Sequence, residues 1–268
     1  MGSIDPYFRE AGLGPAVICI HSGYGSSGQW RALMERLADR FRVIACDMSG
    51  SGKSPALPPE VEYTLDEEVT FLGPVFQASG ERFHLIGHSF GGAVALKAAL
   101  RHRERVQSLT LFEPTLFALL ISSAPDSPAT REIIRHTEST SRLADLGHFE
   151  AAAEEFVDYW FQSGAWGAMR EDVRADILGR MSFVRQRWDA LLRDPVVRSD
   201  VASIDVRTLY LMGEKSNLPT RALGKLLIDV IPRVRGIDIE GVGHMAPLND
   251  PGRVNPLIDD FLQEATCA

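Results

Sequence analysis

The chain has 268 residues, a length that suits one large α/β domain with an insertion or two small domains. Its composition, 45% hydrophobic and 24% charged, provides enough apolar mass for a full core, and the formal net charge of −8 argues against nucleic acid or an anionic membrane as the main partner. No apolar stretch in the sequence reaches the length of a membrane span.

The start of the chain and the cysteines indicate the compartment. The first residues, MGSIDPYFREAG, lack the basic region followed by an apolar one that is typical of a secretory signal. Cys19 and Cys46 lie in apolar runs and Cys267 lies in the tail, a pattern that favours reduced thiols over a disulfide framework. We therefore expect a cytoplasmic protein. The absence of C-x-x-C and H-E-x-x-H spacing predicts no metal, and no motif implies an organic cofactor.

Strand-like and helix-like segments alternate over the first 114 residues. Apolar runs predict strands at 15–21, 41–47, 82–88 and 107–114. Apolar residues at helical spacing predict helices at 29–40, 66–79 and 91–106. Strict alternation of this kind predicts a parallel sheet with helices on both faces.

The alternation stops after Pro114 and resumes near residue 203. The segment between them contains no convincing strand and is predicted to form several helices. Further on, strands are predicted at 206–213 and 234–241, and helices at 220–231 and 254–265. The sequence therefore predicts an α/β core formed by residues 1–114 and 203–268, interrupted by a helical insertion at 115–202.

Two glycine-rich stretches resemble phosphate-binding loops. HSGYGSSG contains G-x-G-x-x-G at Gly23, Gly25 and Gly28, and Asp47 closes the next strand, which outlines a dinucleotide-binding fingerprint. The other stretch, GSGKS at 50–54, resembles the end of a P-loop, but Asp47 stands where the pattern needs glycine. A P-loop leads directly into a helix, but the prolines that follow this stretch disfavour a helix there. We therefore reject the interpretation as a nucleotide hydrolase.

A third motif, GHSFGG, places Ser89 at the centre of G-x-S-x-G between a predicted strand and a predicted helix. This context is the one that a nucleophile elbow requires. Glycines two residues to either side of the serine let strand and helix approach without Cβ clashes. The sharp turn also directs backbone N–H groups and the positive end of the helix toward the hydroxyl. Ser89 is therefore the candidate nucleophile.

The serine needs a base, because a hydroxyl is a poor nucleophile at neutral pH. His244 lies in the loop GVGHMAP after a late strand, where it can reach the carboxyl end of a parallel sheet. The other histidines fit this role less well: we expect His102, His136 and His148 to be exposed, and His21, His84 and His88 to be packed around strands and loops. His244 is therefore the candidate base.

Taken together, these motifs resemble the α/β-hydrolase-fold enzymes over nearly the whole chain. The matching pieces include HSGYGSS, DMSGSGKS, GHSFGGAVAL and GVGHMAP, in the order of that family. The resemblance implies that the glycine-rich loop supplies a backbone N–H, from Gly23, to an oxyanion hole, with the second N–H from Phe90. Asp47 then serves the DMSGSG turn instead of a ribose, and residues 115–202 form a lid.

The resemblance also implies the activity. We expect a serine hydrolase that attacks a small to medium, mainly apolar carbonyl compound: an ester, a thioester, a lactone or a substrate with a cleavable carbon–carbon bond. The same fold supports lyase or cofactor-free peroxidase chemistry, and a ligand-binding receptor with negligible turnover is a further alternative. We expect a small molecule as the partner, and a homodimer remains open.

The acid of the triad is the least determined residue. The family most often places it after the strand TLYLMG, where an aspartate at position 216 would be common, but this chain has Ser216 there. Glu214 is nearby, two residues early. The alternative is Glu113, which directly follows the strand SLTLF, where some members such as haloalkane dehalogenases carry a glutamate. We favour Glu113, because a carboxylate that closes an apolar strand needs a partner.

The insertion is rich in aromatic residues and arginines. Most of the aromatic residues are expected to form its own core, but some of those on a lid would line an apolar pocket. Trp160 and Trp188, together with Tyr24 of the glycine-rich loop, are our candidates for substrate contact. We expect the arginines of this segment to lie on solvated helix faces, namely Arg170, Arg174, Arg180, Arg185 and Arg187.

Overall fold

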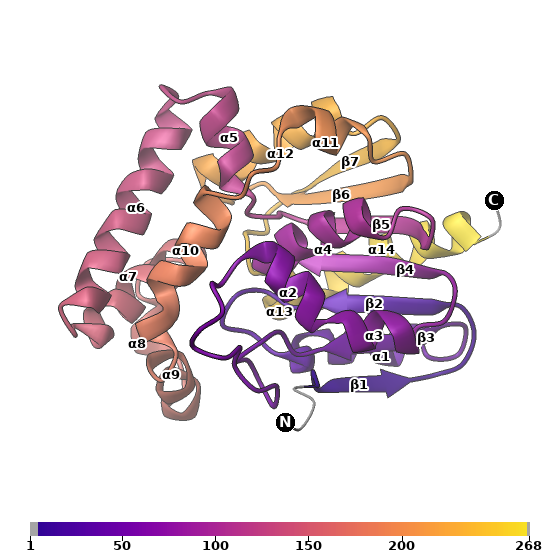
Figure 1. The fold of residues 1–268 in the computed structure, drawn as a ribbon, viewed down its shortest axis with the longest axis horizontal. Coiled ribbons are helices and arrows are strands. Elements are labelled where there is room, and N and C mark those ends of the chain that lie inside the picture. The colour runs from indigo at the N-terminus through magenta and orange to yellow at the C-terminus, as the bar shows by residue number, and fades with distance from the viewer. Residues whose placement is uncertain (1–4, 267–268) are drawn as a thin grey trace.

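Seven strands form one sheet in the computed structural model, which describes residues 5–266 (Figure 1). The strands are β1 (Phe8–Ala11), β2 (Ala16–Ile20), β3 (Arg42–Cys46), β4 (Phe83–His88), β5 (Val106–Phe112), β6 (Arg207–Gly213) and β7 (Val234–Ile239). Neighbouring strands are parallel throughout, except for β1 and β3, which are antiparallel. The predicted mostly parallel α/β sheet is confirmed. The edge strand β1 was not predicted, because its sequence FREA contains two charged residues and no apolar run.

The order of the strands, β1-β3-β2-β4-β5-β6-β7, creates a switch point beside β2. After β2 the chain passes to β3 on one side, and it then returns to β4 on the other side. Loops that leave the carboxyl ends of two such strands run in opposite directions, which opens a crevice between them. The glycine-rich loop after β2 and the elbow after β4 both lie at this crevice.

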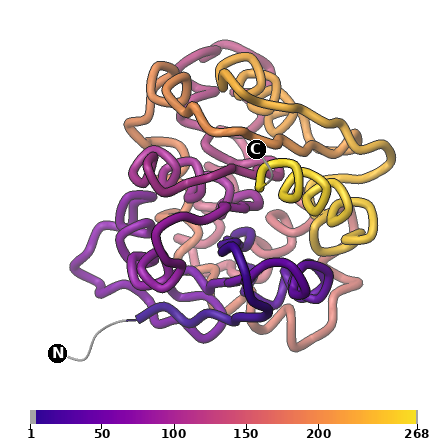
Figure 2. The backbone as a smooth tube through the Cα atoms, turned by 90° about the vertical axis from the view of Figure 1, so that its right-hand side faces the viewer, coloured from indigo at the N-terminus to yellow at the C-terminus, as the bar shows by residue number. Residues whose placement is uncertain are grey.

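Helices cover both faces of the sheet, as Figures 1 and 2 show. One face carries α1 (Arg31–Leu37), after a 3-10 helix (Ser27–Trp30), and α14 (Pro251–Thr266), after the short α13 (Ala246–Asn249). The other face carries α2 (Leu65–Phe71), α3 (Gly73–Ala78), α4 (Phe90–Arg101) and α12 (Leu218–Val230). Along β2, Val17 and Cys19 pack toward the first face, and Ile18 and Ile20 pack toward the second. A strand buried on both faces explains the unbroken apolar run AVICI.

The predicted helix at 66–79 is two helices, α2 and α3, joined at Leu72. Gly73 and Pro74 stand at the junction. Proline has no N–H to donate and its ring clashes with the carbonyl of the preceding turn, so one helix ends and a second begins with Pro74 in its first turn.

A helical insertion joins β5 to β6 and stands beyond the carboxyl ends of the strands (Figure 1). Its helices are α5 (Phe117–Ser123), α6 (Pro128–Asp145), α7 (Phe149–Trp160), α8 (Ala165–Ala168), α9 (Glu171–Leu178), the 3-10 helix η2 (Met181–Phe183) and α10 (Val184–Leu192). The last helix of the segment, α11 (Arg198–Ala202), packs against α4 and α12 of the core.

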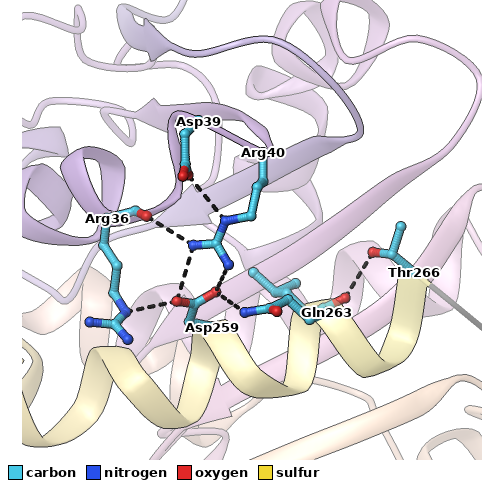
Figure 3. A network of polar contacts seen from close by, with 7 residues as sticks. Arg36, Asp39, Arg40, Asp259, Gln263 and Thr266 are labelled. Carbon is cyan, nitrogen blue, oxygen red and sulfur yellow. Dashed lines mark hydrogen bonds and ion pairs between the residues drawn. The ribbon is translucent and has the colours of Figure 1, made fainter.

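An ionic cluster joins α14 to α1 and to the turn that follows α1 (Figure 3). The carboxylate of Asp259 accepts a hydrogen bond from Arg36 at 2.9 Å and pairs with Arg40 at 3.0 Å. Gln263, one turn later on α14, donates a further hydrogen bond at 2.8 Å. Burial alone would raise the pKa of Asp259, but the hydrogen bonds from Arg40 and Gln263 outweigh it and lower this pKa. The cluster thus keeps a buried carboxylate ionised where the two helices meet.

The helices described for residues 5–266 include none that is long and apolar enough to cross a bilayer. In the same part of the chain, no group of three or more His, Cys, Asp and Glu side chains is placed to hold a metal ion. Among the described residues, Cys19 and Cys46 are buried free cysteines, and burial raises the pKa of both thiols. Cys267, predicted to lie in the tail, is outside the described residues.

Candidate active site

Ser89 lies on the sharp turn between β4 and α4, in a strained backbone conformation. Its φ of 57° and ψ of −121° are unusual for a residue with a side chain. The turn is held by the N–H of Ser89, which donates to the carbonyl of Phe112 on β5 at 2.9 Å, and by Gly92, which donates back to the carbonyl of Ser89. The turn places Ser89 beyond the end of β4, where the residue borders the main cavity.

The glycines around Ser89 are required by close packing. A Cβ atom at Gly87 would lie 2.4 Å from the carbonyl oxygen of Gly91, and one at Gly91 would lie 2.2 Å from that of His21. A Cβ atom at Gly92 would lie 2.9 Å from Pro114. Side chains at these positions would push the strand, the helix and the neighbouring loops apart, so the motif follows from the space available.

His244 reaches Ser89 from the loop between β7 and α13. Its Nε2 atom is 2.9 Å from Ser89 Oγ, and the side chain is buried. The backbone carbonyl of His244 accepts a hydrogen bond from Nε2 of His88, 2.9 Å away, so the residue before the nucleophile anchors the loop that carries the base. Ser89 and His244, which the sequence predicted as nucleophile and base, therefore lie within hydrogen-bond distance of each other.

Glu113 meets the opposite nitrogen of the same imidazole. Its Oε2 atom is 2.6 Å from His244 Nδ1, and its side chain is fully buried. A carboxylate only accepts hydrogen bonds, so Nδ1 carries the proton and Nε2 presents its lone pair to Ser89. Glu214, the alternative, is exposed and accepts a hydrogen bond from the N–H of Gly241 instead. The structure brings Glu113, and not Glu214, to the imidazole.

The glycine-rich loop after β2 faces the elbow. Gly23 approaches Phe90 so closely that a Cβ atom on the glycine would lie 3.5 Å from the Cβ of Phe90. None of the hydrogen bonds described for residues 5–266 uses the backbone N–H of Gly23 or of Phe90. Both residues border the cavity that contains Ser89. Two unpaired donors beside a nucleophile suit a substrate oxygen that develops negative charge.

His21 holds this loop in place. Its Nδ1 atom donates to the carbonyl of Ser22 at 2.7 Å, and its Nε2 atom accepts from the N–H of Met48 at 3.0 Å. A carbonyl can only accept a hydrogen bond and a backbone N–H can only donate one. The ring of His21 therefore carries a proton on Nδ1 alone and is neutral. Burial lowers the pKa of His21 to about 4, in agreement with this assignment. Ser22 is held in turn by Gln29, whose Oε1 atom accepts from its N–H and its hydroxyl.

The two phosphate-loop patterns have other structural roles. Asp47 accepts hydrogen bonds from the backbone N–H groups of Ser27 at 2.5 Å and Lys53 at 2.8 Å, so its carboxylate organises two loops and is not free for a ribose. The GSGKS stretch is followed by loop until α2 begins at Leu65. It does not lead directly into a helix as a P-loop does.

A cavity of about 520 Å³ lies above Ser89 and His244, between the glycine-rich loop and the helical insertion. Its walls are mainly apolar and aromatic. The three predicted contact residues, Tyr24, Trp160 and Trp188, all border it. The ring of Trp160 lies over that of His244, with 4.5 Å between the ring centres. This size is within the usual range for small-molecule sites.

Arg180 and Arg187 differ from the sequence expectation, which placed them on solvated faces. Both are buried, with 8% and 7% of their surface exposed. Arg180 donates to the backbone carbonyl of Tyr24 at 2.6 Å and pairs with Asp176, so it ties the insertion to the glycine-rich loop. Arg170 and Arg185 are exposed as expected.

Arg187 borders the cavity and has no carboxylate partner within ion-pair distance among the described residues. Its Nη1 atom is buried without a hydrogen-bond partner, and its Nη2 atom has only a long contact of 3.4 Å to Ser51. The guanidinium lies over the rings of Tyr24 and Phe90, 5.0 and 5.8 Å from their centres. The sequence did carry a signal: Arg187 shares the apolar stripe of α10 with residues 184 and 191.

His136 is a second correction, because it was expected to be exposed. It is 7% exposed and stacks on Tyr159, with ring centres 3.8 Å apart, inside an aromatic cluster that also contains Trp160 and Trp188. Burial lowers its pKa to about 3. Surrounding polar residues on α6 made the segment look solvated, but position 136 lies on the face that packs against α7 and α10. His102 is half-buried and His148 is exposed.

Comparison with known proteins finds relatives that are named as hydrolases and esterases. A 2-hydroxy-6-oxo-6-(2'-aminophenyl)hexa-2,4-dienoic acid hydrolase of Metapseudomonas resinovorans is 28% identical, over 93% of this chain and 84% of that protein. A 2-hydroxymuconate semialdehyde hydrolase of a Pseudomonas strain is 29% identical, over 97% of this chain and 91% of its own. A pimeloyl-(acyl-carrier protein) methyl ester esterase of Aeromonas hydrophila is 28% identical, over 94% of this chain and 96% of that protein.

Solved structures show the same architecture. A hydrolase from Oleispira antarctica superposes with a TM-score of 0.80 at 20% identity, over 97% of this chain and 95% of that one. An esterase from Thermogutta terrifontis superposes with a TM-score of 0.74 at 24% identity, over 97% of this chain and 93% of that one. The family model described as the alpha/beta hydrolase fold matches residues 15–251. The chain therefore belongs to the α/β hydrolase fold family.

Proposed function

We propose that this hydrolase cleaves a mainly apolar carbonyl substrate that carries an acidic group, through an acyl-enzyme on Ser89. The observation that carries the proposal is the line of hydrogen bonds from Glu113 through His244 to Ser89, which ends in a cavity bordered by the unpaired Arg187. The relatives support the hydrolytic part, and the cavity supports the character of the substrate.

In the proposed reaction, Ser89 Oγ attacks the carbonyl carbon while His244 Nε2 accepts its proton. Glu113 stabilises the imidazolium that forms and keeps its ring in the required orientation. The N–H groups of Gly23 and Phe90 donate to the oxygen of the tetrahedral intermediate. His244 then protonates the leaving group, and it later activates the water that releases the acid from Ser89. An ester, a thioester, a lactone or a carbon–carbon bond beside a ketone offers the carbonyl that this sequence needs.

The helical insertion serves as the lid of this site in our proposal. It contributes Trp160 and Trp188 to the cavity wall, and Arg180 attaches it to the loop that carries Gly23. A lid of this kind excludes bulk water, which strengthens the electrostatic stabilisation of the oxyanion. The mostly apolar walls favour a substrate with an alkyl, alkenyl or aromatic portion.

Arg187 favours an acidic substrate. A buried guanidinium is costly unless it is paired, and the described residues offer it aromatic faces but no carboxylate. Glu68 is the buried acid that attracts it from a distance, but its own oxygens accept hydrogen bonds from the N–H and hydroxyl of Ser49. A carboxylate or enolate oxygen of the substrate would supply the missing partner. The name of the Metapseudomonas relative, a dienoic acid hydrolase, agrees with such a substrate.

The test uses pairs of chromogenic esters that are identical except for a terminal carboxylate or methyl ester. We expect kcat/KM to favour the acidic member of each pair. Arg187→Met should lower kcat/KM for the acidic ester by about 10–100-fold, the worth of a hydrogen bond to a charged group, and leave the neutral ester nearly unchanged. Arg185→Met, on the exposed side of the same helix, is the matched control.

Covalent labelling tests the nucleophile. A fluorophosphonate should label the natural protein and fail to label Ser89→Ala, which should also lose turnover. Labelling of another serine in that variant would refute the mechanism. If Arg187→Met lowers kcat/KM equally for the acidic and the neutral esters, the proposal of an acidic substrate is refuted, whereas the mechanism at Ser89 is not affected.

A further inference from the structure

The turn that joins β6 to α12 holds the oxygen of Glu113 that faces away from His244. Glu113 Oε1 accepts a hydrogen bond from the N–H of Gly213 and another from the hydroxyl of Ser216, each at 2.6 Å. The other oxygen, Oε2, contacts His244. Glu113 thus has three donors around a fully buried carboxylate, and two of them come from one four-residue turn.

The turn itself is fixed by backbone hydrogen bonds. The N–H of Ser216 donates to the carbonyl of Gly213 at 3.2 Å, and the N–H of Lys215 donates to Val242 at 2.9 Å. Arg221, one turn into α12, donates to the carbonyl of Gly213 at 2.9 Å. The Ser216 hydroxyl is therefore presented to Glu113 by a rigid support.

Gly213 cannot carry a side chain in this arrangement. A Cβ atom there would lie 2.6 Å from the carbonyl oxygen of Val242 and 3.0 Å from Ser216 Oγ. The absence of a side chain lets both donors of the turn approach the same carboxylate oxygen.

We propose that Ser216 is a positioning residue for the carboxylate of Glu113, an inference that rests on the proposed function. Glu113 has a positive φ of 44°, and its side chain needs an external constraint to keep Oε2 on His244 Nδ1. The hydroxyl of Ser216 and the N–H of Gly213 provide that constraint by holding Oε1. They also supply hydrogen bonds to the ionised carboxylate, which stabilise the negative charge that the imidazolium requires.

A second, more polar cavity of about 440 Å³ reaches Ser216. It also borders Asn217, His244 and Trp160. If the Ser216 hydroxyl is removed and space remains, a water molecule from this cavity can donate to Glu113 in its place. A substitution that tests the hydroxyl must therefore fill the same volume.

Ser216→Thr and Ser216→Val form the matched pair. Both add the same bulk, but only the threonine keeps a hydroxyl. We expect Ser216→Thr to retain most of kcat, and Ser216→Val to have a kcat lower by about 10–100-fold with KM changed less than twofold, because the hydroxyl bonds a charged group that acts on the imidazole and not on the substrate. The kcat of Ser216→Ala should lie between those of the other two variants. Ser79→Ala, a buried serine at the end of α3, is the control for loss of a hydroxyl elsewhere.

A proton NMR measurement adds a readout that simple destabilisation does not move. The Nδ1 proton between His244 and Glu113 should give a far-downfield resonance, which we expect to persist in Ser216→Thr and to weaken or shift in Ser216→Val. Equal kcat and the same resonance in the two variants would overturn the positioning role. If Glu113→Gln also keeps full activity, the proposed function fails, whereas an inactive Glu113→Gln beside a fully active Ser216→Val refutes this inference alone.

Discussion

His244 Nδ1 lies 2.6 Å from Oε2 of Glu113, a residue 131 positions earlier in the chain, which follows β5, whereas Glu214 follows β6. The carboxylate therefore arrives from the end of β5, and the end of β6 contributes the turn that holds its other oxygen. This contact places Glu113, and not Glu214, beside the imidazole of His244.

Glu113→Gln should lower kcat by about 10⁴-fold, as loss of the acid does in a related triad, because an amide that donates to His244 Nδ1 favours the wrong tautomer of the ring and cannot stabilise an imidazolium by charge. Glu214→Gln should keep most of the activity, since its carboxylate is exposed and accepts a hydrogen bond from the N–H of Gly241. Steady-state kinetics on one ester compare the two variants. A nearly inactive Glu214→Gln with an active Glu113→Gln would transfer the role to the later strand.

Gly23→Pro should lower kcat by about 10²–10³-fold, because it removes one of the two donors proposed for the oxyanion. Gly23→Ala is the matched control: a Cβ atom meets only ordinary contact with Phe90, so this variant should fold and keep its N–H. Turnover of the two variants is compared at equal labelling by fluorophosphonate. Micromolar binding of NAD or ATP, measured by calorimetry, would contradict the assignment of this loop.

Stability should fall as the pH drops below about 6.5, because several histidines are neutral in the folded protein. Burial lowers the pKa of His136 to about 3, whereas the unfolded residue takes up a proton near pH 6.5. Below that pH the unfolded state binds the extra proton, so His136 lowers the free energy of unfolding by about 1.4 kcal/mol per pH unit until the pH reaches about 3. His21 and His84 act in the same direction down to about pH 4.

His136→Phe should flatten this dependence, since a phenyl ring can stack on Tyr159 and does not titrate. Melting temperatures between pH 7 and pH 5 measure the slope, and His148→Gln, at an exposed position, is the control. An unchanged slope in His136→Phe would mean that the acid sensitivity arises elsewhere.

Asp259→Asn should destabilise the protein by about 1–3 kcal/mol at pH 7, because it removes the charge that the guanidinium groups of Arg36 and Arg40 share at the junction of α1 and α14. The folded pKa of Asp259 lies below its usual value, so its contribution is full above the unfolded pKa and is lost as the pH falls through the folded one. Urea unfolding of both proteins at pH 7 and at pH 3 measures the difference, which should shrink at the lower pH.

Much of the fold and part of the site follow from the sequence, because they depend on local geometry. Strands buried on both faces read as unbroken apolar runs, and this explains why β2 to β6 were predicted. The elbow at Ser89 is visible because glycine spacing reports how closely a strand and a helix approach. The edge strand β1 escaped prediction, since an edge strand with one covered side needs no apolar run.

Only the tertiary structure decided which carboxylate meets His244, because both Glu113 and Glu214 directly follow an apolar strand. The choice depends on the backbone turn at Glu113, with its φ of 44°, and on the donors that β6 places around the carboxylate. Burial of Arg187 and His136 was decided in the same way. Periodicity shows which residues share a face of a helix, but the packing of distant segments determines whether that face meets solvent, another helix or a cavity.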